Sequence, residues 1–119
     1  MNARKIVDIL LEEEEEDFDA YFLAAITPWE AINFVLKNPE LGPKLEPVLA
    51  RSGLHSFNYA NKILHGPFPA GEPEIAKDGI TAGRYALHVI KKPFPLGEPA
   101  IAKAGEYREL YNQRFGTNI

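Results

Sequence analysis

One stretch of 26 residues occurs twice in succession in this chain. The first copy, residues 59–84, reads YANKILHGPFPAGEPEIAKDGITAGR, and the second, residues 85–110, reads YALHVIKKPFPLGEPAIAKAGEYREL. Aligned without a gap, the copies share 12 of 26 positions. A repeat of this length is typical of stacked arrays, in which each unit buries its apolar face only against its neighbours. The repeat therefore restricts the fold more than any other feature.

The shared positions include a tyrosine and the tripeptides Pro-Phe-Pro, Gly-Glu-Pro and Ile-Ala-Lys. Paired by register, they include Tyr59 and Tyr85, Phe68 and Phe94, Glu72 and Glu98, Ile75 and Ile101, and Gly79 and Gly105. A step of 26 residues upstream reaches Glu46, and one downstream reaches Tyr111. These steps predict a degenerate copy before residue 59 and a half unit after residue 110.

The residue types predict a longer helix followed by a shorter one in each unit. Tyr85, Ala86, Val89 and Ile90 recur at i, i+1, i+4 and i+5, which is one stripe of an α-helix. Pro-Phe-Pro ends that helix, because proline lacks the N–H and disfavours helical geometry in the residue before it.

The shorter helix is predicted to begin at Glu98-Pro99, because proline is tolerated in the first turn and glutamate suits the helix dipole. Ile101 and Ala102 give it a buried side. Gly105, like Gly79, is predicted to end the short helix as a left-handed cap. Since neither helix can bury its stripe alone, we expect the units to stack.

We therefore predict an all-α protein. It would be a short helical-repeat, α-solenoid-like array of about 2.5–3 helix–turn–helix units behind an N-terminal helical cap. One domain is expected from 119 residues. Its predicted parts are an acidic helical cap (1–26), a degenerate first repeat (27–58), two repeats (59–84 and 85–110) and a terminal half unit (111–119).

The first 37 residues are predicted to contain three helices. Residues 3–16 form an amphipathic pattern with the stripe Ile6, Val7, Leu10 and Leu11. A short helix over residues 18–26, capped by Asp17 or Asp19, would bury Phe18, Tyr21 and Phe22. Thr27-Pro28-Trp29-Glu30 is a capping box that begins the third helix. The inward residues of this third helix are predicted to be Trp29, Ile32, Val35 and Leu36.

Composition indicates a folded chain. A hydrophobic content of 45% with 11% aromatic residues is enough for a core. The absence of cysteine excludes disulfides and fits a reducing cytoplasm. No apolar run approaches the ~18 residues of a membrane span, and the first apolar stretch is too short and too acidic at its end for a signal peptide.

The residues show no catalytic or metal-binding pattern. None of the three histidines has a second ligand at metal spacing, and the repeat register places lysine where His65 and His88 stand, so we expect them to face solvent. Asp17 and Asp19 could hold a hard cation beside five glutamates, but no glycine turn or EF-hand glutamate accompanies them. Neither serine has an identifiable general base that could activate it as a nucleophile. We expect no enzyme activity, no metal and no cofactor.

A resemblance to a known family rests on the repeat itself. The pattern YA-x-x-(I/V)-(L/I)-x-x-x-F-P-x-x-E-x-x-IA-K resembles a repeat of uncharacterised tailed-bacteriophage proteins. It is carried by Tyr59-Ala60, Tyr85-Ala86, Phe68-Pro69, Phe94-Pro95, Glu72, Glu98, Ile75-Ala76 and Ile101-Ala102. The resemblance covers about half of the chain well, implies a phage origin and an α-helical repeat fold, and brings no catalytic residues.

Charge is distributed unevenly along the chain. Residues 1–58 hold 5 basic and 11 acidic side chains, net −6, whereas residues 59–119 hold 8 and 6, net +2. The basic residues of the second part are interleaved with acids in the sequence, so direct nucleic-acid binding is not expected. The acidic run is either a solvated helix end or a mimic of DNA that occupies a nucleic-acid site on a partner protein.

Two groups of residues are candidates for binding a partner. The acidic run consists of Glu12, Glu13, Glu14, Glu15, Glu16, Asp17 and Asp19. Phe68 and Phe94 are either buried staples between units or exposed anchors. The remaining repeated residues are predicted to be structural, with each glutamate opening a helix: Tyr59, Tyr85, Tyr111, Glu46, Glu72, Glu98, Ile75 and Ile101.

We expect a small non-enzymatic binding protein, phage-encoded and acting in the cytoplasm of the infected bacterium on a host or phage protein. Its specific form would be an inhibitor of a host defence or transcription component. One alternative is a structural or assembly part of the virion. Another is an oligomeric sponge for nucleotides, with pockets lined by Arg84, Arg108 and tyrosines. A homodimer through residues 107–115 is also considered.

Overall fold

The computed structural model describes the backbone of residues 20–119 and the side chains of residues 23–119. The predicted helix over residues 3–16, the acidic run with its proposed capping and metal roles, and the side chains of Phe18, Tyr21 and Phe22 lie outside the described residues.

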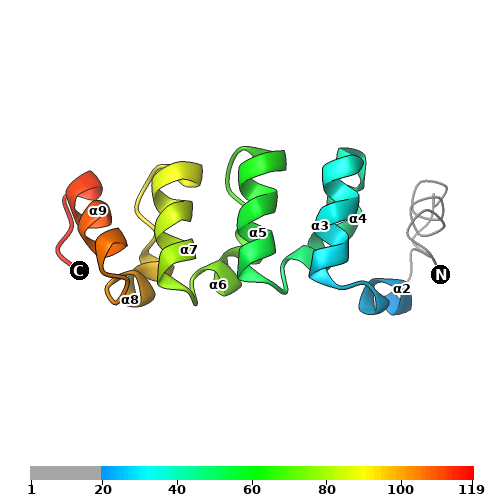
Figure 1. The fold of residues 1–119 in the computed structure, drawn as a ribbon, viewed down its shortest axis with the longest axis horizontal. Coiled ribbons are helices and arrows are strands. Elements are labelled where there is room, and N and C mark those ends of the chain that lie inside the picture. Colours follow the sequence, from blue (N-terminus) through cyan, green and yellow to red (C-terminus); the bar gives the residue numbers. More distant parts are fainter. Residues whose placement is uncertain (1–19) are drawn as a thin grey trace.

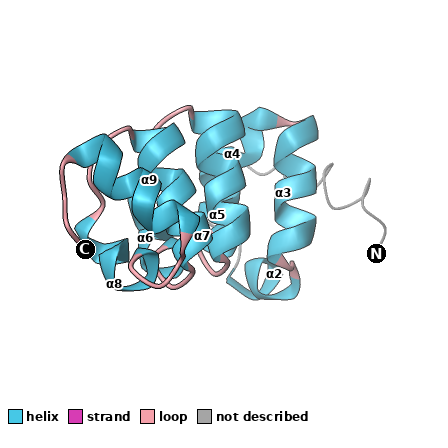
Figure 2. Cartoon of the chain, turned by 60° about the vertical axis from the view of Figure 1, so that its left-hand side comes forward, coloured by secondary structure: helices cyan, strands magenta, loops and turns pink. Residues whose placement is uncertain are grey.

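The described residues form helices and no strand, so the all-α prediction is confirmed for this part of the chain (Figure 2). The longer elements, called the long helices below, are α3 (Pro28–Lys37), α5 (Gly53–Tyr59) with its π-helical continuation η2 (Ala60–Leu64), α7 (Gly79–Arg84) with its π-helical continuation η4 (Tyr85–Ile90), and α9 (Glu106–Phe115). The other elements are α2 (Ala20–Ala25), η1 (Pro39–Leu41) with α4 (Gly42–Leu49), η3 (Pro69–Gly71) with α6 (Glu72–Ile75), and η5 (Pro95–Gly97) with α8 (Glu98–Ile101).

The long helices stand side by side along the longest axis of the molecule (Figure 1). The extent along this axis is 49 Å, against 22 and 21 Å across it. The short helices α2, α6 and α8 lie along the edge where the long helices begin, which we call the N-terminal edge. The opposite edge, where the long helices end and the chain turns back, is the C-terminal edge. α2 lies near one end of the long axis and α9 at the other.

Helix α3 begins at the predicted capping box. The Glu30 amide donates to the Thr27 hydroxyl at 3.1 Å, and the Thr27 amide donates to the Glu30 carboxylate at 3.0 Å. Ile32 is buried as predicted, but Trp29 is 65% exposed and Leu36 42% exposed, so the inward prediction is wrong for these two. Trp29 and Leu36 are seven residues apart and therefore lie on the same side of the helix. The buried residues Ala31, Phe34 and Val35 are centred on the opposite side.

The two middle long helices end in the same unusual way. Each passes from α- into π-helical geometry and ends at a left-handed residue, His65 (φ 53°) or Lys91 (φ 55°), two residues before a proline. A left-handed conformation is costly for a residue with a Cβ. Helix α9 has no π segment and ends at a left-handed glycine, Gly116. No residue pattern in the sequence signals the π segments.

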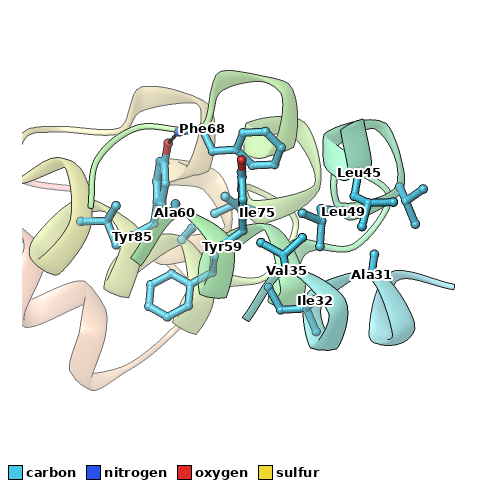
Figure 3. Packing of buried hydrophobic residues seen from close by; sticks show 14 of the residues in the cluster. Ala31, Ile32, Val35, Leu45, Leu49, Tyr59, Ala60, Phe68, Ile75 and Tyr85 are labelled. Carbon is cyan, nitrogen blue, oxygen red and sulfur yellow. Dashed lines mark hydrogen bonds between the residues drawn. The ribbon is translucent and has the colours of Figure 1, made fainter. Parts of the chain in front are cut away.

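A single apolar core runs through the stack. Its largest fully buried side chains include Tyr59, Tyr85 and Tyr111, which stand at equivalent positions of three long helices. The short helices contribute Ile75 and Ile101, both fully buried as predicted. Figure 3 shows the ring of Tyr59 beside Phe68, and the hydroxyl of Tyr85 directed at the backbone nitrogen of Phe68.

Glycines at the start of the long helices allow close packing. Gly79 is the first residue of α7, where a Cβ would collide with the carbonyl oxygen of Ala100 in α8. Gly53 begins α5, where a Cβ would lie 2.6 Å from the carbonyl oxygen of Glu74 in α6. The prediction of left-handed caps is therefore wrong. Gly79 has no positive φ, and Gly105 combines φ 53° with ψ −109°, outside the left-handed helical region.

The first unit departs from the 26-residue spacing. Asn38, Phe68 and Phe94 share one backbone conformation (φ −126° to −138°, ψ 78° to 81°), and each precedes a proline that begins a 3-10 turn. Glu72 and Glu98 open their helices as predicted, four residues after Phe68 and Phe94. Glu46 follows Asn38 by eight residues and lies inside α4, so the prediction that it opens a helix is wrong. The extra four residues are about one helical turn.

Candidate partner-binding surfaces

The repeated tyrosines and glutamates hold the stack together. The hydroxyls of Tyr59, Tyr85 and Tyr111 each donate to the glutamate thirteen residues earlier, at 2.6, 2.6 and 2.5 Å. Two of these hydroxyls also accept a hydrogen bond, at 2.9 Å, from a backbone amide of the preceding turn. Burial, and then the hydrogen bond to glutamate, raises the pKa of Tyr111 to about 12 and raises the pKa values of Tyr59 and Tyr85.

The amides that donate to the tyrosines belong to Phe68 and Phe94. Their rings are 2% and 4% exposed, and each lies edge-on against Tyr59 or Tyr85, with ring centroids 5.0 and 5.1 Å apart. Phe68 and Phe94 are therefore buried staples, and the alternative in which they are exposed anchors is excluded by their burial. In α9, Phe115 makes the corresponding contact with Tyr111 at 4.9 Å.

Exposed apolar side chains recur at one position of the long helices. Trp29, Leu54 and Ile80 each occupy the second residue of α3, α5 or α7, and their exposed fractions are 65%, 54% and 51%. Because these helices stand side by side, equivalent residues lie in a line along the N-terminal edge (Figure 1). We call Trp29, Leu54 and Ile80 the apolar row. Glu106, the first residue of α9, matches Ile80 in the 26-residue register.

A half-buried histidine lies beside the first member of the row. The rings of Trp29 and His55 are 6.2 Å apart, so α3 and α5 meet at this point of the surface. The Nδ1 atom of His55 is buried and has no hydrogen-bond partner among the described residues. Burial lowers the pKa of His55, so the side chain is neutral near pH 7. A neutral imidazole keeps this part of the row free of charge.

A second surface lies between η4 and α9. A groove of about 540 Å³ is lined by Leu87, His88, Lys91, Leu110, Gln113 and Arg114, and we call it the end groove. A smaller hollow of about 140 Å³ shares His88 and Lys91 with it and adds His65. His65, His88, Lys91 and Arg114 are thus adjacent across three units, and all four are exposed. No acidic residue lines either hollow.

Charges that alternate in the sequence are separated in the fold. The acidic residues after position 59 lie in α6, in α8 or in the first turn of α9, apart from Asp78, the N-cap of α7. Residues 85–97 and 110–119, which include the last turns of η4 and α9 and the segments that follow them, contain no acid. None of the basic residues of the end groove forms an ion pair with a described residue, and the ion pair Lys77–Glu74 lies elsewhere.

The described residues form no metal cluster and leave the predicted sponge residues engaged. No group of three or more potential ligands capable of holding a metal ion occurs in residues 20–119. The guanidinium of Arg84 lies 4.7 Å above the ring of Phe57, and Arg108 donates to the carbonyl oxygen of Ile119 at 2.6 Å. The three repeated tyrosine hydroxyls already bind glutamate.

Among the described helices, none is long and apolar enough to cross a membrane. Comparisons with protein-family models, with curated proteins and with solved structures found no match for this chain. The candidate sites therefore rest on the residues and their geometry.

Sequence reasoning did not identify two of these features. The apolar row could not be predicted from Trp29, because the spacing of this residue also fits the buried stripe of its helix. The only signal in the sequence was that Leu54 and Ile80 are one repeat apart. The tyrosine–glutamate bonds had a signal that a search for constant separations could have found. A glutamate precedes each repeated tyrosine by thirteen residues in all three copies.

Proposed function

We propose that this chain is a non-enzymatic protein-binding module, built as a short α-solenoid-like array whose apolar row binds a partner protein. In the specific form that the phage-repeat resemblance suggests, the protein is phage-encoded and inhibits a host defence or transcription component in the bacterial cytoplasm. The observation that carries the proposal is the recurrence of an exposed apolar residue at the second position of three successive long helices.

Isolated apolar side chains are common on protein surfaces, but their alignment here is not random. Packed helices lie about 8–10 Å apart, so the row presents an apolar side chain at that interval. One face of a partner α-helix presents residues i, i+7 and i+14 at intervals of about 10.5 Å. The row therefore fits an amphipathic partner helix, or another partner with the same spacing.

The helix starts that carry the row are capped by side-chain hydrogen bonds. Each of the three row residues follows a helix N-cap, Thr27, Ser52 or Asp78, whose side chain accepts from the backbone amide three residues later. Behind the row, the buried tyrosines and phenylalanines link each unit to the next. A fixed surface loses little conformational entropy on binding, and tryptophan is a frequent source of binding energy in protein interfaces.

The test is an affinity capture from bacterial lysate with three tagged baits. The wild-type chain is compared with a Leu54→Asp, Ile80→Asp variant, in which two row residues become charged. The matched control is Leu64→Asp, Leu96→Asp, which introduces the same charges at exposed leucines outside the row. All four positions are exposed, so circular dichroism and Tm should change little.

We expect a stoichiometric partner with wild type and control, reduced at least tenfold with the row variant. Equal capture by all three baits, or no partner at all, would refute the proposal. A Glu12–Glu16 to Gln bait run in parallel separates the acidic run from the row, because a partner lost only there binds the acidic run. A captured virion protein would indicate the assembly role.

A further inference from the structure

We propose that the end groove binds residues 10–17 of a second copy of this chain, so that two copies associate through complementary ends. The end groove lies at the α9 end of the molecule and is separate from the apolar row. The inference therefore does not depend on the proposed function.

The chemistry of the groove selects an acidic ligand with apolar residues. Its basic side chains are His88, Lys91 and Arg114, and its apolar side chains are Leu87 and Leu110. Each of these basic residues is exposed and lacks an ion pair among the described residues. Lysine and arginine on a surface without acidic neighbours create a positive potential that attracts carboxylates.

The chain itself contains a segment with the matching chemistry. Residues 10–17 read LLEEEEED, two leucines followed by six carboxylates. The leucines match the apolar side chains of the groove, and the carboxylates match its basic side chains. The opposite net charges of residues 1–58 and 59–119 extend the same complementarity to whole ends of the molecule.

The segment cannot lie in the groove of its own chain. For Glu16 to enter that groove, the four residues from it to Ala20 would have to span the distance, whereas an extended chain spans at most about 3.5 Å per residue. The residues that line the groove belong to the ends of η4 and α9, and these helices lie two to three helix spacings of about 8–10 Å from α3 (Figure 1). The contact must therefore form between copies.

An antiparallel pair of copies satisfies both contacts at once. In that arrangement the acidic segment of each copy lies at the α9 end of its partner, and the two contacts are related by a twofold axis. Closed twofold pairs are the commonest form of protein self-association. The contact differs from the dimer through residues 107–115, because each interface here contains residues 10–17 of one chain and the groove of the other.

The experiment measures association by analytical ultracentrifugation at low salt, about 50 mM, and at about 0.5 M, where exposed charges are screened. Variant A changes Glu12–Glu16 to Gln and removes the acidic ligand. Variant B is Lys91→Glu, Arg114→Glu, which reverses the charge of two residues that line the groove. The control variant, Lys37→Glu, Lys103→Glu, makes the same charge change at exposed lysines outside the groove.

We expect wild type and control to associate at low salt, with a dissociation constant at least tenfold higher in 0.5 M salt. Variants A and B should each be monomeric alone, and a mixture of A and B should associate, because B supplies the acidic segment and A the groove. This rescue distinguishes a specific contact from a folding defect.

Three results would overturn the proposal: a wild-type chain that is monomeric at all salt concentrations, association unchanged in variant B, or an A and B mixture that fails to associate. A single-stranded oligonucleotide is tested in parallel. If it binds wild type but not variant B while the wild type remains monomeric, the groove is a nucleic-acid site and the proposal is wrong.

Discussion

The hydroxyl of a buried tyrosine links two units of this protein. In Tyr85 the hydroxyl donates to the carboxylate of Glu72 and accepts from the amide of Phe68, so one oxygen fixes both the start of a short helix and the turn before it. Tyr111 does the same with Glu98 and Phe94. The bonds from the two amides are buried and those to the two glutamates are partly buried, and a missing partner costs more in such surroundings than in water.

Replacing Tyr85 by phenylalanine should destabilise the protein by about 1–3 kcal/mol, because the buried amide of Phe68 and the carboxylate of Glu72 lose their partner. Chemical denaturation measures the free energy of unfolding directly. The control is Tyr107→Phe, a half-buried tyrosine whose hydroxyl makes no hydrogen bond to a described residue. Equal losses in the two variants would contradict the role given to the Tyr85 hydroxyl.

Much of the residue-scale detail could be predicted, but not all of it. The stripe of Tyr85, Ala86 and Val89 is buried because its spacing follows the helical period. Trp29 and Leu36 could not be placed, since a stripe does not reveal which face meets a neighbour. The candidate sites were harder still. The sequence does not reveal which apolar residues are exposed. The basic residues of the end groove are far apart in sequence and become neighbours only when the helices pack together.

At the scale of secondary-structure elements, a glycine at the start of one long helix lies against a carbonyl oxygen of the next short helix. The contact occurs between Gly53 and Glu74 and again between Gly79 and Ala100, pairs that are both 21 residues apart. A Cβ at either glycine would push the short helix away. The glycines of the repeat therefore set the distance between units rather than ending a helix.

Gly79→Ala should destabilise the protein by about 1–3 kcal/mol or more through overpacking against α8. Gly66→Ala serves as the control, because a Cβ there approaches no atom closer than 3.9 Å and its φ is not positive. Thermal unfolding of the two variants provides the comparison. A Tm for Gly79→Ala equal to that of Gly66→Ala would show that the helices can separate without cost.

Some elements could not have been predicted from the residues. The π segments η2 and η4 end at His65 and Lys91, neither of which is the glycine that usually marks a left-handed residue. The additional turn of α4 could not be predicted, because Glu46-Pro47 matches the later units in the 26-residue register. The turn before α4 has Asn38 where the later units have a phenylalanine, so the sequence does not mark it. The helix–turn–helix order of residues 59–115 was predictable, since proline and glutamate mark each boundary.

At the scale of the whole molecule, the stack depends on three tyrosines that stay protonated when folded. In the unfolded chain a tyrosine loses its proton near pH 10, whereas burial holds the pKa of Tyr111 at about 12 and raises those of Tyr59 and Tyr85. Above pH 10 the folded state therefore binds more protons than the unfolded state, and stability falls as pH rises.

We expect the free energy of unfolding to be insensitive to these tyrosines below pH 10. Between pH 10 and 12 it should fall by up to about 1.4 kcal/mol per pH unit for each of them. Urea denaturation at a series of pH values measures the slope. In Tyr111→Phe the slope should be smaller by about a third, and an unchanged slope would show that Tyr111 titrates alike in both states.

The contact between a long helix and the following short helix has a consequence for the length of the molecule. Because the Gly53–Glu74 and Gly79–Ala100 contacts have the same spacing, a duplicated block of residues 79–104 inserted after residue 104 would repeat a contact that the chain already makes twice. Such a protein would grow by about one helix spacing of 8–10 Å and would add another isoleucine beyond Ile80. Duplication of one 26-residue block is thus expected to lengthen the molecule, and with it the apolar row, by one fixed step.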